Sequence, residues 1–180
     1  MSFKSVLTPL ALVAAALLAP SSHAQQSSAA APASPLDNVP DKMPFDIPYG
    51  APIPLARAEA LIAVAVAEAR KHDWKLVVAV VDSGGNLVAL QRMDGAQLAS
   101  ISVAEHKARA SAQYRRETRV FESAIQEKGN LYVMTLDGMI GSRGGIPLVE
   151  NGKLVGAIGC SGGTGSQDEV ACKAAVATIK

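Results

Sequence analysis

In the first half of the folded region, apolar residues first recur at the spacing of a helix and then form a continuous run. Apolar residues recur at helical spacing after Pro54, which suits the first turn of a helix, and we expect this helix to end near His72. The run over 75–81 is rich in β-branched residues, which favours a strand buried on both faces. A turn over 82–86 precedes a second apolar stretch, so residues 87–93 are predicted to return as the partner strand of a hairpin.

Helical patterns follow this hairpin. Residues 100–115 form an alanine-rich helical pattern. Thr118 is a good N-cap residue, and we expect it to begin a short helix that ends near Glu127. Residues 131–144 have no clear period and are predicted to be a loop with a strand or turn fragment.

A second hairpin is predicted in the last third of the chain. Asn151 and Gly152 form a dipeptide typical of tight hairpins, and they separate predicted strands at 145–150 and 153–160. Hairpins imply antiparallel pairing, and the neighbouring helices bury their apolar faces only if they pack on the sheet. The order of elements therefore predicts an α+β fold, an antiparallel sheet of two hairpins flanked by helices.

The N-terminal residues have the pattern of a cleavable export signal. Lys4 precedes an apolar run over 6–19, which is too short to span a bilayer of about 30 Å comfortably, and Ser22 and Ala24 provide the small residues of a cleavage site. We therefore expect residues 1–24 to be a signal peptide and the mature protein to be periplasmic or secreted.

A spacer is predicted between this leader and the folded domain. Residues 25–52 are rich in Pro, Ser and Ala, with few large apolar side chains, which is typical of a flexible segment. Within them, residues 41–52 contain scattered apolar residues and have the composition of an extended strap that docks on the domain. The domain itself is expected over 53–180.

Charge and composition narrow the classes of partner. Removal of the leader takes away Lys4 and no acid, which leaves 16 basic against 16 acidic residues. A chain with this balance has no electrostatic attraction for nucleic acid or anionic lipid, so neither partner is expected after the leader is removed. Aromatic residues are only 4% of the chain, so the core must rely on small aliphatic side chains and close helix-on-sheet packing.

Five sequence blocks, in order along the chain, resemble the GlcG/HbpS family, which includes the C-terminal domain of PduO-type proteins. The blocks lie at 80–87, 91–96, 107–112, 144–148 and 156–163, the last followed by Gln167-Asp168-Glu169. The resemblance covers about residues 53–180. It implies a profilin-like α-β-α sandwich that forms dimers or larger homo-oligomers. For some members it implies binding of haem or a related tetrapyrrole, and for others an enzymatic reaction on a small molecule.

Two histidines remain after the leader is removed, and both are candidate ligands of haem iron. Some members of the family place a ligand histidine on the first helix. This chain has none there, and His72 at the end of that helix is the nearest substitute. His106 lies within the alanine-rich helix. The alternative for each is a surface residue of a helix, and neither belongs to a paired motif that would hold zinc.

The charged residues of the sequence blocks are the candidates for catalysis. Lys107, Arg92 and Asp94 lie at strand ends or in the helical region, where a pocket would form. A buried lysine with a carboxylate partner can serve as an acid, a base or an anchor for an anion. Asp82 is a further charged residue of these blocks, and the alternative for the set is an internal salt bridge that holds the hairpin to the helix.

The glycine-rich loop after the last strand has two interpretations. Its residues Ser161, Gly162 and Gly163 could bind a propionate or another carboxylate through backbone N–H groups. The simpler interpretation, which we favour from the sequence, is a turn that needs positive φ angles. Ser166 and Glu169 have the spacing of a capping box and are expected to begin the last helix.

The two cysteines leave a further choice open. Cys160 is predicted at the end of a strand and Cys172 about two turns into the following helix. In an exported protein such a pair invites a disulfide, but two separate buried thiols are the other possibility.

Three functions remain after these considerations. The leading hypothesis is an exported haem- or tetrapyrrole-binding protein without catalytic turnover. The second is a small-molecule enzyme of lyase or isomerase type that uses Lys107, Arg92 and Asp94 at an oligomer interface. The third is an accessory oligomeric protein whose pocket is filled by its own side chains.

Overall fold

The computed structural model describes residues 39–179. The predicted signal peptide and most of the predicted spacer lie outside these described residues. The elements follow the expected order, and their bounds are α1 (Leu55–Lys71), β1 (Val77–Asp82), β2 (Leu87–Arg92), α2 (Ser100–Tyr114), α3 (Arg119–Gln126), the 3₁₀ helix η2 (Leu131–Thr135), β3 (Gly145–Glu150), β4 (Lys153–Ser161) and α4 (Gly165–Val176).

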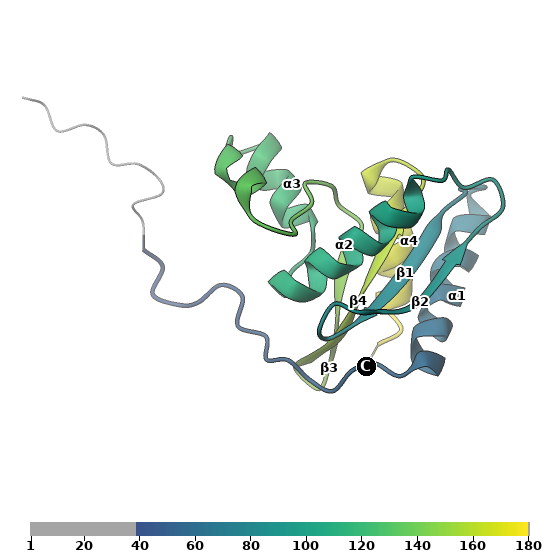
Figure 1. The fold of residues 1–180 in the computed structure, drawn as a ribbon, viewed down its shortest axis with the longest axis horizontal. Coiled ribbons are helices and arrows are strands. Elements are labelled where there is room, and N and C mark those ends of the chain that lie inside the picture. Colours follow the sequence, from purple (N-terminus) through teal and green to yellow (C-terminus); the bar gives the residue numbers. More distant parts are fainter. Residues whose placement is uncertain (1–38, 180) are drawn as a thin grey trace, which may run out of the picture. The chain divides into compact units, whose positions relative to one another are not determined.

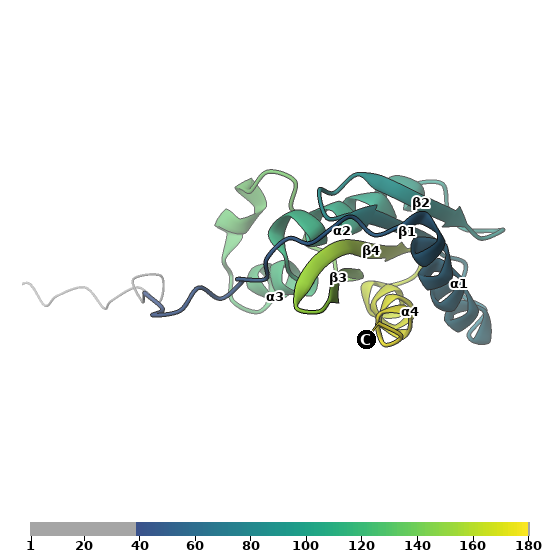
Figure 2. The same cartoon turned by 90° about the horizontal axis from the view of Figure 1, so that it is seen from below.

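The two predicted hairpins join into one antiparallel sheet in the order β2-β1-β4-β3. Helices α1 and α4 pack together on one face of this sheet, and α2 covers the other face (Figure 1). The rotated view separates the three layers, with the sheet between α2 and the α1/α4 pair (Figure 2). The α+β class and the α-β-α sandwich are therefore confirmed.

The core follows from the apolar pattern of the first two elements. Five of the six residues of β1 are buried, because the strand is central and covered on both faces. The buried residues of α1 recur three and four positions apart, as a single helical face requires, at Ala58, Leu61, Ile62, Ala65, Val66 and Ala69.

Helix α2 lies unusually close to the sheet because glycines face it. A Cβ atom at Gly159 of β4 would collide with the backbone of Ala104 and Ala108, and one at Gly145 of β3 would collide with the carbonyl of Lys107. The small residues of α2 match these glycines, so helix and strand backbones are in direct contact. This is the close packing that the low aromatic content predicts.

The strap is present and pairs with the start of β4. The N–H of Gly50 donates to the Leu154 carbonyl at 2.7 Å, and the N–H of Leu154 donates to the Pro48 carbonyl at 2.8 Å. Strand β1 ends its pairing with β4 at Gly156, which leaves the preceding residues of β4 without a partner on that side. The strap supplies that partner and satisfies backbone groups that would otherwise be unpaired.

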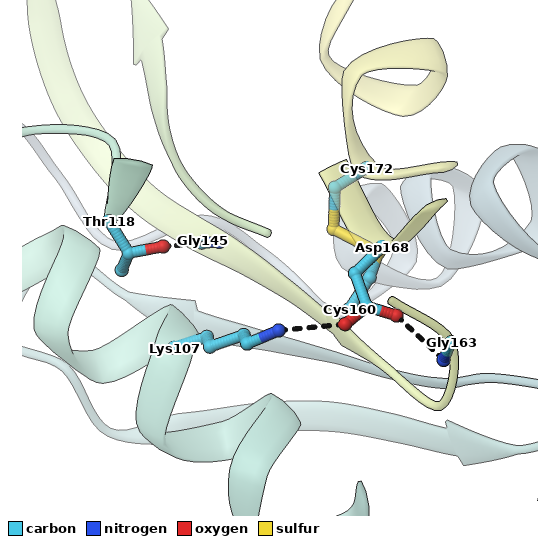
Figure 3. Close-up of a disulfide and its surroundings, with 7 residues drawn as sticks. All are labelled: Lys107, Thr118, Gly145, Cys160, Gly163, Asp168 and Cys172. Carbon is cyan, nitrogen blue, oxygen red and sulfur yellow. Dashed lines mark hydrogen bonds and ion pairs between the residues drawn. A yellow bond between two sulfur atoms is a disulfide. The ribbon is translucent and has the colours of Figure 1, made fainter. Parts of the chain in front are cut away.

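The cysteines form a disulfide, which resolves the choice left open by the sequence. Cys160 of β4 and Cys172 of α4 have Cα atoms 5.9 Å apart, and both residues are fully buried. Helix α4 folds back over the end of β4, and the bond ties the helix to the sheet (Figure 3).

Two local predictions are corrected. The capping box of α4 is formed by Thr164 and Gln167, because the helix begins at Gly165 and therefore already contains Ser166 and Glu169. The Thr118 hydroxyl does not cap α3. It accepts a hydrogen bond from the Gly145 N–H at 3.0 Å and so joins this end of the helix to β3.

Of the strand or turn fragment predicted within the loop over 131–144, the structure has the turn. The regular part of this region is η2, whose side chains at Leu131, Tyr132 and Met134 are more than half exposed.

Candidate functional site

A buried ion pair links the two faces of the sandwich. The Lys107 ammonium of α2 donates to Oδ2 of Asp168 in α4 at 2.8 Å, and both side chains are almost completely buried (Figure 3). The second carboxylate oxygen, Oδ1, accepts from the Gly163 N–H at 3.0 Å. Lys107 therefore belongs to an internal ion pair, and its partner is Asp168, not the hairpin residues Asp82 or Asp94.

The surroundings of this pair act on the protonation of Asp168. Burial raises the pKa of the Asp168 carboxyl, whereas the Lys107 ammonium and the backbone N–H groups of Gly163 and Gly162 oppose that change. Neither residue lines any of five surface cavities formed by the described residues. Its geometry suits a fixed connection between α2 and α4 more than contact with a substrate.

The glycine-rich loop is organised by the same carboxylate. The N–H of Gly163, a donor that an anion could use, is already bound to Asp168, and the N–H of Thr164 donates to the Gln167 side chain at 2.8 Å. Gly162 has a φ of 148°, and a Cβ there would collide with the carbonyl of Lys75. Ser161 is buried at the end of β4. The geometry thus favours the turn interpretation of this loop.

An ionic cluster continues from this junction to the surface. Glu122 of α3 accepts hydrogen bonds from the side chain of Arg143 at 2.7 Å and from its backbone N–H at 2.6 Å. Burial acts to raise the pKa of Glu122, but these hydrogen bonds from Arg143 outweigh it and hold that pKa below its usual value. Glu169, nine-tenths buried, lies 2.9 Å from the Lys173 ammonium and 3.7 Å from Arg143.

The candidate site residues predicted from the sequence did not include Asp168, Glu122 or Arg143. Asp168 was visible in the Gln167-Asp168-Glu169 block, and a buried lysine requires an acidic partner. Nothing in the spacing of Glu122 and Arg143, however, indicated that α3 and the segment before β3 would meet.

His106 lies at the edge of a surface cavity. The cavity has a volume of about 310 Å³ and is lined by Ser102, Glu105, His106, Arg109 and Gly138. The side chain is half-buried, and its Nε2 is 3.2 Å from the Gly138 carbonyl oxygen. Because a carbonyl can only accept, Nε2 carries the hydrogen and Nδ1 carries the free lone pair. Ligating histidines commonly have this arrangement, in which one ring nitrogen is held by a backbone carbonyl.

His72 occupies a more exposed position at the end of α1. Its ring stacks on Trp74, with 4.3 Å between the centroids, and its Nε2 is 3.3 Å from a carboxylate oxygen of Glu68. The side chain is 44% exposed, and it lines none of the same five cavities formed by the described residues. One face of the imidazole is therefore covered by the indole, and no enclosure for a ligand surrounds it.

Arg92 and Asp94 lie together but apart from Lys107. They line a cavity of about 350 Å³ with Arg70, Lys75, Gln91 and Met93 at the end of β2. Within the described residues, no hydrogen bond or ion pair joins Arg92 or Asp94 to Lys107. The structure thus does not assemble the three candidate catalytic residues into one site.

Neither a metal-binding cluster nor a membrane-spanning helix is present among residues 39–179. No group of three or more His, Cys, Asp or Glu residues in this range could hold a metal ion. None of the helices in the same range is both long and apolar enough to cross a membrane.

Comparisons with known proteins agree with the fold and the sequence blocks. Residues 53–177 match the model of a family described as haem degrading protein, HbpS-like. Protein GlcG of Escherichia coli (strain K12) is 39% identical over 104 residues, which are 58% of this chain and 77% of GlcG.

Two solved structures are also similar to this chain in fold and in sequence. A double mutant of Streptomyces reticuli HbpS has a TM-score of 0.66 and 27% identity, and the match covers 84% of this chain and 99% of that one. The structure of a PduOC:heme complex has a TM-score of 0.65 and 26% identity, with 72% and 96% covered.

The buried ion pair can be tested by removing one partner and then both. Lys107→Met leaves the Asp168 carboxylate buried without its cation, so we expect the free energy of unfolding to fall by about 3–5 kcal/mol. Adding Asp168→Asn removes the stranded charge but keeps an acceptor for the Gly163 N–H. Urea denaturation of the double variant should therefore show a smaller loss than the sum of the two single losses. Additive losses would contradict a direct pairing.

The Glu122–Arg143 contact predicts a pH-dependent stability. Because the folded-state pKa of Glu122 is lowered, its contribution is present above the pKa of the unfolded chain and lost as the pH falls through the folded value. Glu122→Gln is expected to lower the free energy of unfolding by about 1–3 kcal/mol at neutral pH. The difference from wild type should shrink below about pH 4, the usual range of a glutamate.

Urea titrations at a series of pH values measure this difference, and Glu59→Gln, at an exposed position of α1, is the matched control. A Glu122→Gln effect of equal size at neutral and acidic pH would show that the charge of Glu122 is not involved.

Proposed function

This chain belongs to the HbpS-like family of haem degrading proteins, and on that premise we propose that it is an exported protein that binds haem or a related tetrapyrrole. The family match over residues 53–177 supports the ligand class. Further support comes from the PduOC:heme complex, whose fold and sequence are similar to those of this chain. The role is binding, sensing or storage of the ligand.

The observation that carries the proposal is the arrangement of His106. Its hydrogen bond to the Gly138 carbonyl orients the ring, and Nδ1 has no hydrogen-bond partner among the described residues. A ring held in this way can offer a nitrogen lone pair to haem iron. His72 shares the tautomer, since Glu68 also accepts from Nε2, but its ring is covered by Trp74. We therefore favour His106 as the iron ligand.

The cavity around His106 offers further contacts for a porphyrin. Arg109 lies one turn along α2 from His106 and donates to both Glu105 and the Gly85 carbonyl. Its guanidinium is partly exposed and can pair with a propionate.

A haemin titration followed at the Soret band tests this assignment. We expect a saturable shift with one haem per chain, lost in His106→Gln and retained in His72→Ala. Glutamine can still donate to the Gly138 carbonyl but cannot ligate iron, so the variant separates ligation from folding, and circular dichroism checks the fold. Absence of a saturable shift in the wild type would overturn haem binding, and loss only in His72→Ala would move the ligand to His72.

We propose further that copies of the chain assemble into a homo-oligomer. The exposed apolar side chains of η2, at Leu131, Tyr132 and Met134, form a surface suited to contact with another copy. Light scattering of the titrated samples measures the mass of the assembly. A mass of one chain, with and without haem, would contradict assembly.

Export is proposed from the leader-like residues 1–24, and the Cys160–Cys172 disulfide supports it, because such bonds persist in oxidising compartments. Expression of the full chain in a Gram-negative host is expected to give a periplasmic or secreted product that begins at Gln25, measured by intact mass. Ala24→Arg disrupts the cleavage site and is expected to block this processing. A product that keeps its leader and stays in the cytoplasm would contradict the proposal.

A further inference from the structure

A groove between the strap and α3 is lined by residues that the proposed haem site does not use. Its volume is about 460 Å³, which falls within the range of about 300–1,000 Å³ usual for small-molecule sites. The strap, the end of α2, α3 and β3 all contribute to its walls. We call this feature the strap groove.

One side of the strap groove is apolar. Aliphatic and aromatic side chains from three separate segments line it, namely Phe45, Ile47, Val120 and Pro147. Val120 is 40% exposed, so apolar surface remains in contact with water. This surface gains free energy when an apolar ligand covers it.

The other side of the strap groove is cationic. Its basic residues are Arg115, Arg116, Arg119 and Lys128, and Glu117 is the single acidic residue of the lining. The Glu117 carboxylate lies 3.5 Å from the Lys173 ammonium, so it is already partly neutralised. Arg119 in turn lies 3.7 Å from the Glu169 carboxylate. The excess of positive charge in the groove therefore comes mainly from Arg115, Arg116 and Lys128, although the whole chain is nearly balanced.

Several N–H donors in the strap groove remain available. Arg115 donates one N–H to the Ile47 carbonyl at 3.0 Å, and Arg116 donates its Nε–H to the Tyr114 carbonyl at 2.9 Å. Their other guanidinium N–H groups have no acceptor among the described residues. The Arg116 guanidinium lies 3.3 Å from the centre of the Phe45 ring, which holds the cation directly beside the apolar wall.

The backbone at Arg115 also departs from the usual pattern. Arg115 ends α2 with a φ of 53°, in the left-handed region where glycine is the common residue. A glycine would adopt this conformation more easily, yet the chain has an arginine whose side chain lines the groove. The strained position thus brings two consecutive guanidinium groups to the same side of α2.

We propose that the strap groove binds an aliphatic carboxylate of fatty-acid type, independently of haem. The hydrocarbon tail lies against the apolar wall, and the carboxylate accepts hydrogen bonds from the guanidinium groups of Arg115 and Arg116. Arg119 and Lys128 add electrostatic attraction at the rim. An amphiphile with one anionic head matches this combination, whereas a cationic amphiphile is repelled and a short carboxylate leaves the apolar wall exposed.

Isothermal titration calorimetry with sodium laurate, below the concentration at which it forms micelles, tests the proposal on the full protein. Acetate provides the same head without a tail, and dodecyltrimethylammonium provides the same tail with the opposite charge. We expect laurate to bind at one site per chain, acetate not to bind, and the cationic amphiphile to bind at least about tenfold more weakly.

Charge reversal at the rim locates the site. Arg119→Glu with Lys128→Glu is expected to weaken laurate binding by about tenfold or more, and Arg119→Gln with Lys128→Gln by less. Arg70→Glu with Lys153→Glu makes the same change of charge at exposed positions outside the groove, and it should leave the laurate affinity within about twofold. Thermal melting establishes that each variant is folded.

Four results would overturn the proposal. They are no saturable laurate binding, equal affinity for laurate and the cationic amphiphile, an equal loss in the control double variant, or displacement of laurate by haemin. The last result would identify the groove as the haem site. A change in the mass of the assembly in the rim variants, together with no laurate binding, would identify it as a contact between copies. Because laurate binding is measured without haem, failure of the haem proposal leaves this test unaffected.

Discussion

The close approach of α2 to the sheet is the constraint on which the rest of the structure depends. Helix and strand backbones touch at Gly159 and Gly145, where any side chain would push α2 outward. At this short distance the Lys107 side chain extends beside Gly144 to Asp168 of α4. The glycines therefore determine the geometry of the buried ion pair, and through it the position of the loop that precedes α4.

The ion pair and the disulfide both connect helix α4 to the rest of the domain. Lys107 holds the first turn of α4 at Asp168, and Cys160 holds its second turn at Cys172. Asp168 also accepts from the Gly163 N–H, so the glycine-rich loop is fixed by the same carboxylate. A buried lysine beside a carboxylate resembles a catalytic pair when seen in the sequence. In the folded chain it is enclosed, and it serves to join the two helical layers.

The surfaces available to ligands lie at the periphery of this rigid centre. The cavity at His106 opens on the outer side of α2, and the strap groove opens where α2 ends and the strap crosses. Each is completed by a segment outside the sheet: the region of Gly138 for the first, and Phe45 and Ile47 for the second. This division is physically reasonable, because a site on the periphery can change its ligand without disturbing the core on which stability depends.

The sequence by itself determined the elements, their order and the antiparallel hairpins, since those depend on local periodicity and on turn residues such as Asn151 and Gly152. It also indicated an alanine-rich helix over 100–115 and a helical recurrence of apolar residues in α1. It misplaced the cap of α4 by two residues, because Thr164 and Ser166 are both good capping residues and only the start of the helix distinguishes them.

Only the tertiary structure decided which distant residues meet. Lys107 and Asp168 are 61 positions apart, and Arg115 meets Ile47 across 68 positions, so no local period could reveal either contact. The choice between a disulfide and two thiols likewise depended on how α4 folds back over β4. Side-chain partners of this kind follow from the packing of whole layers, whereas helices and strands follow from the spacing of neighbouring residues.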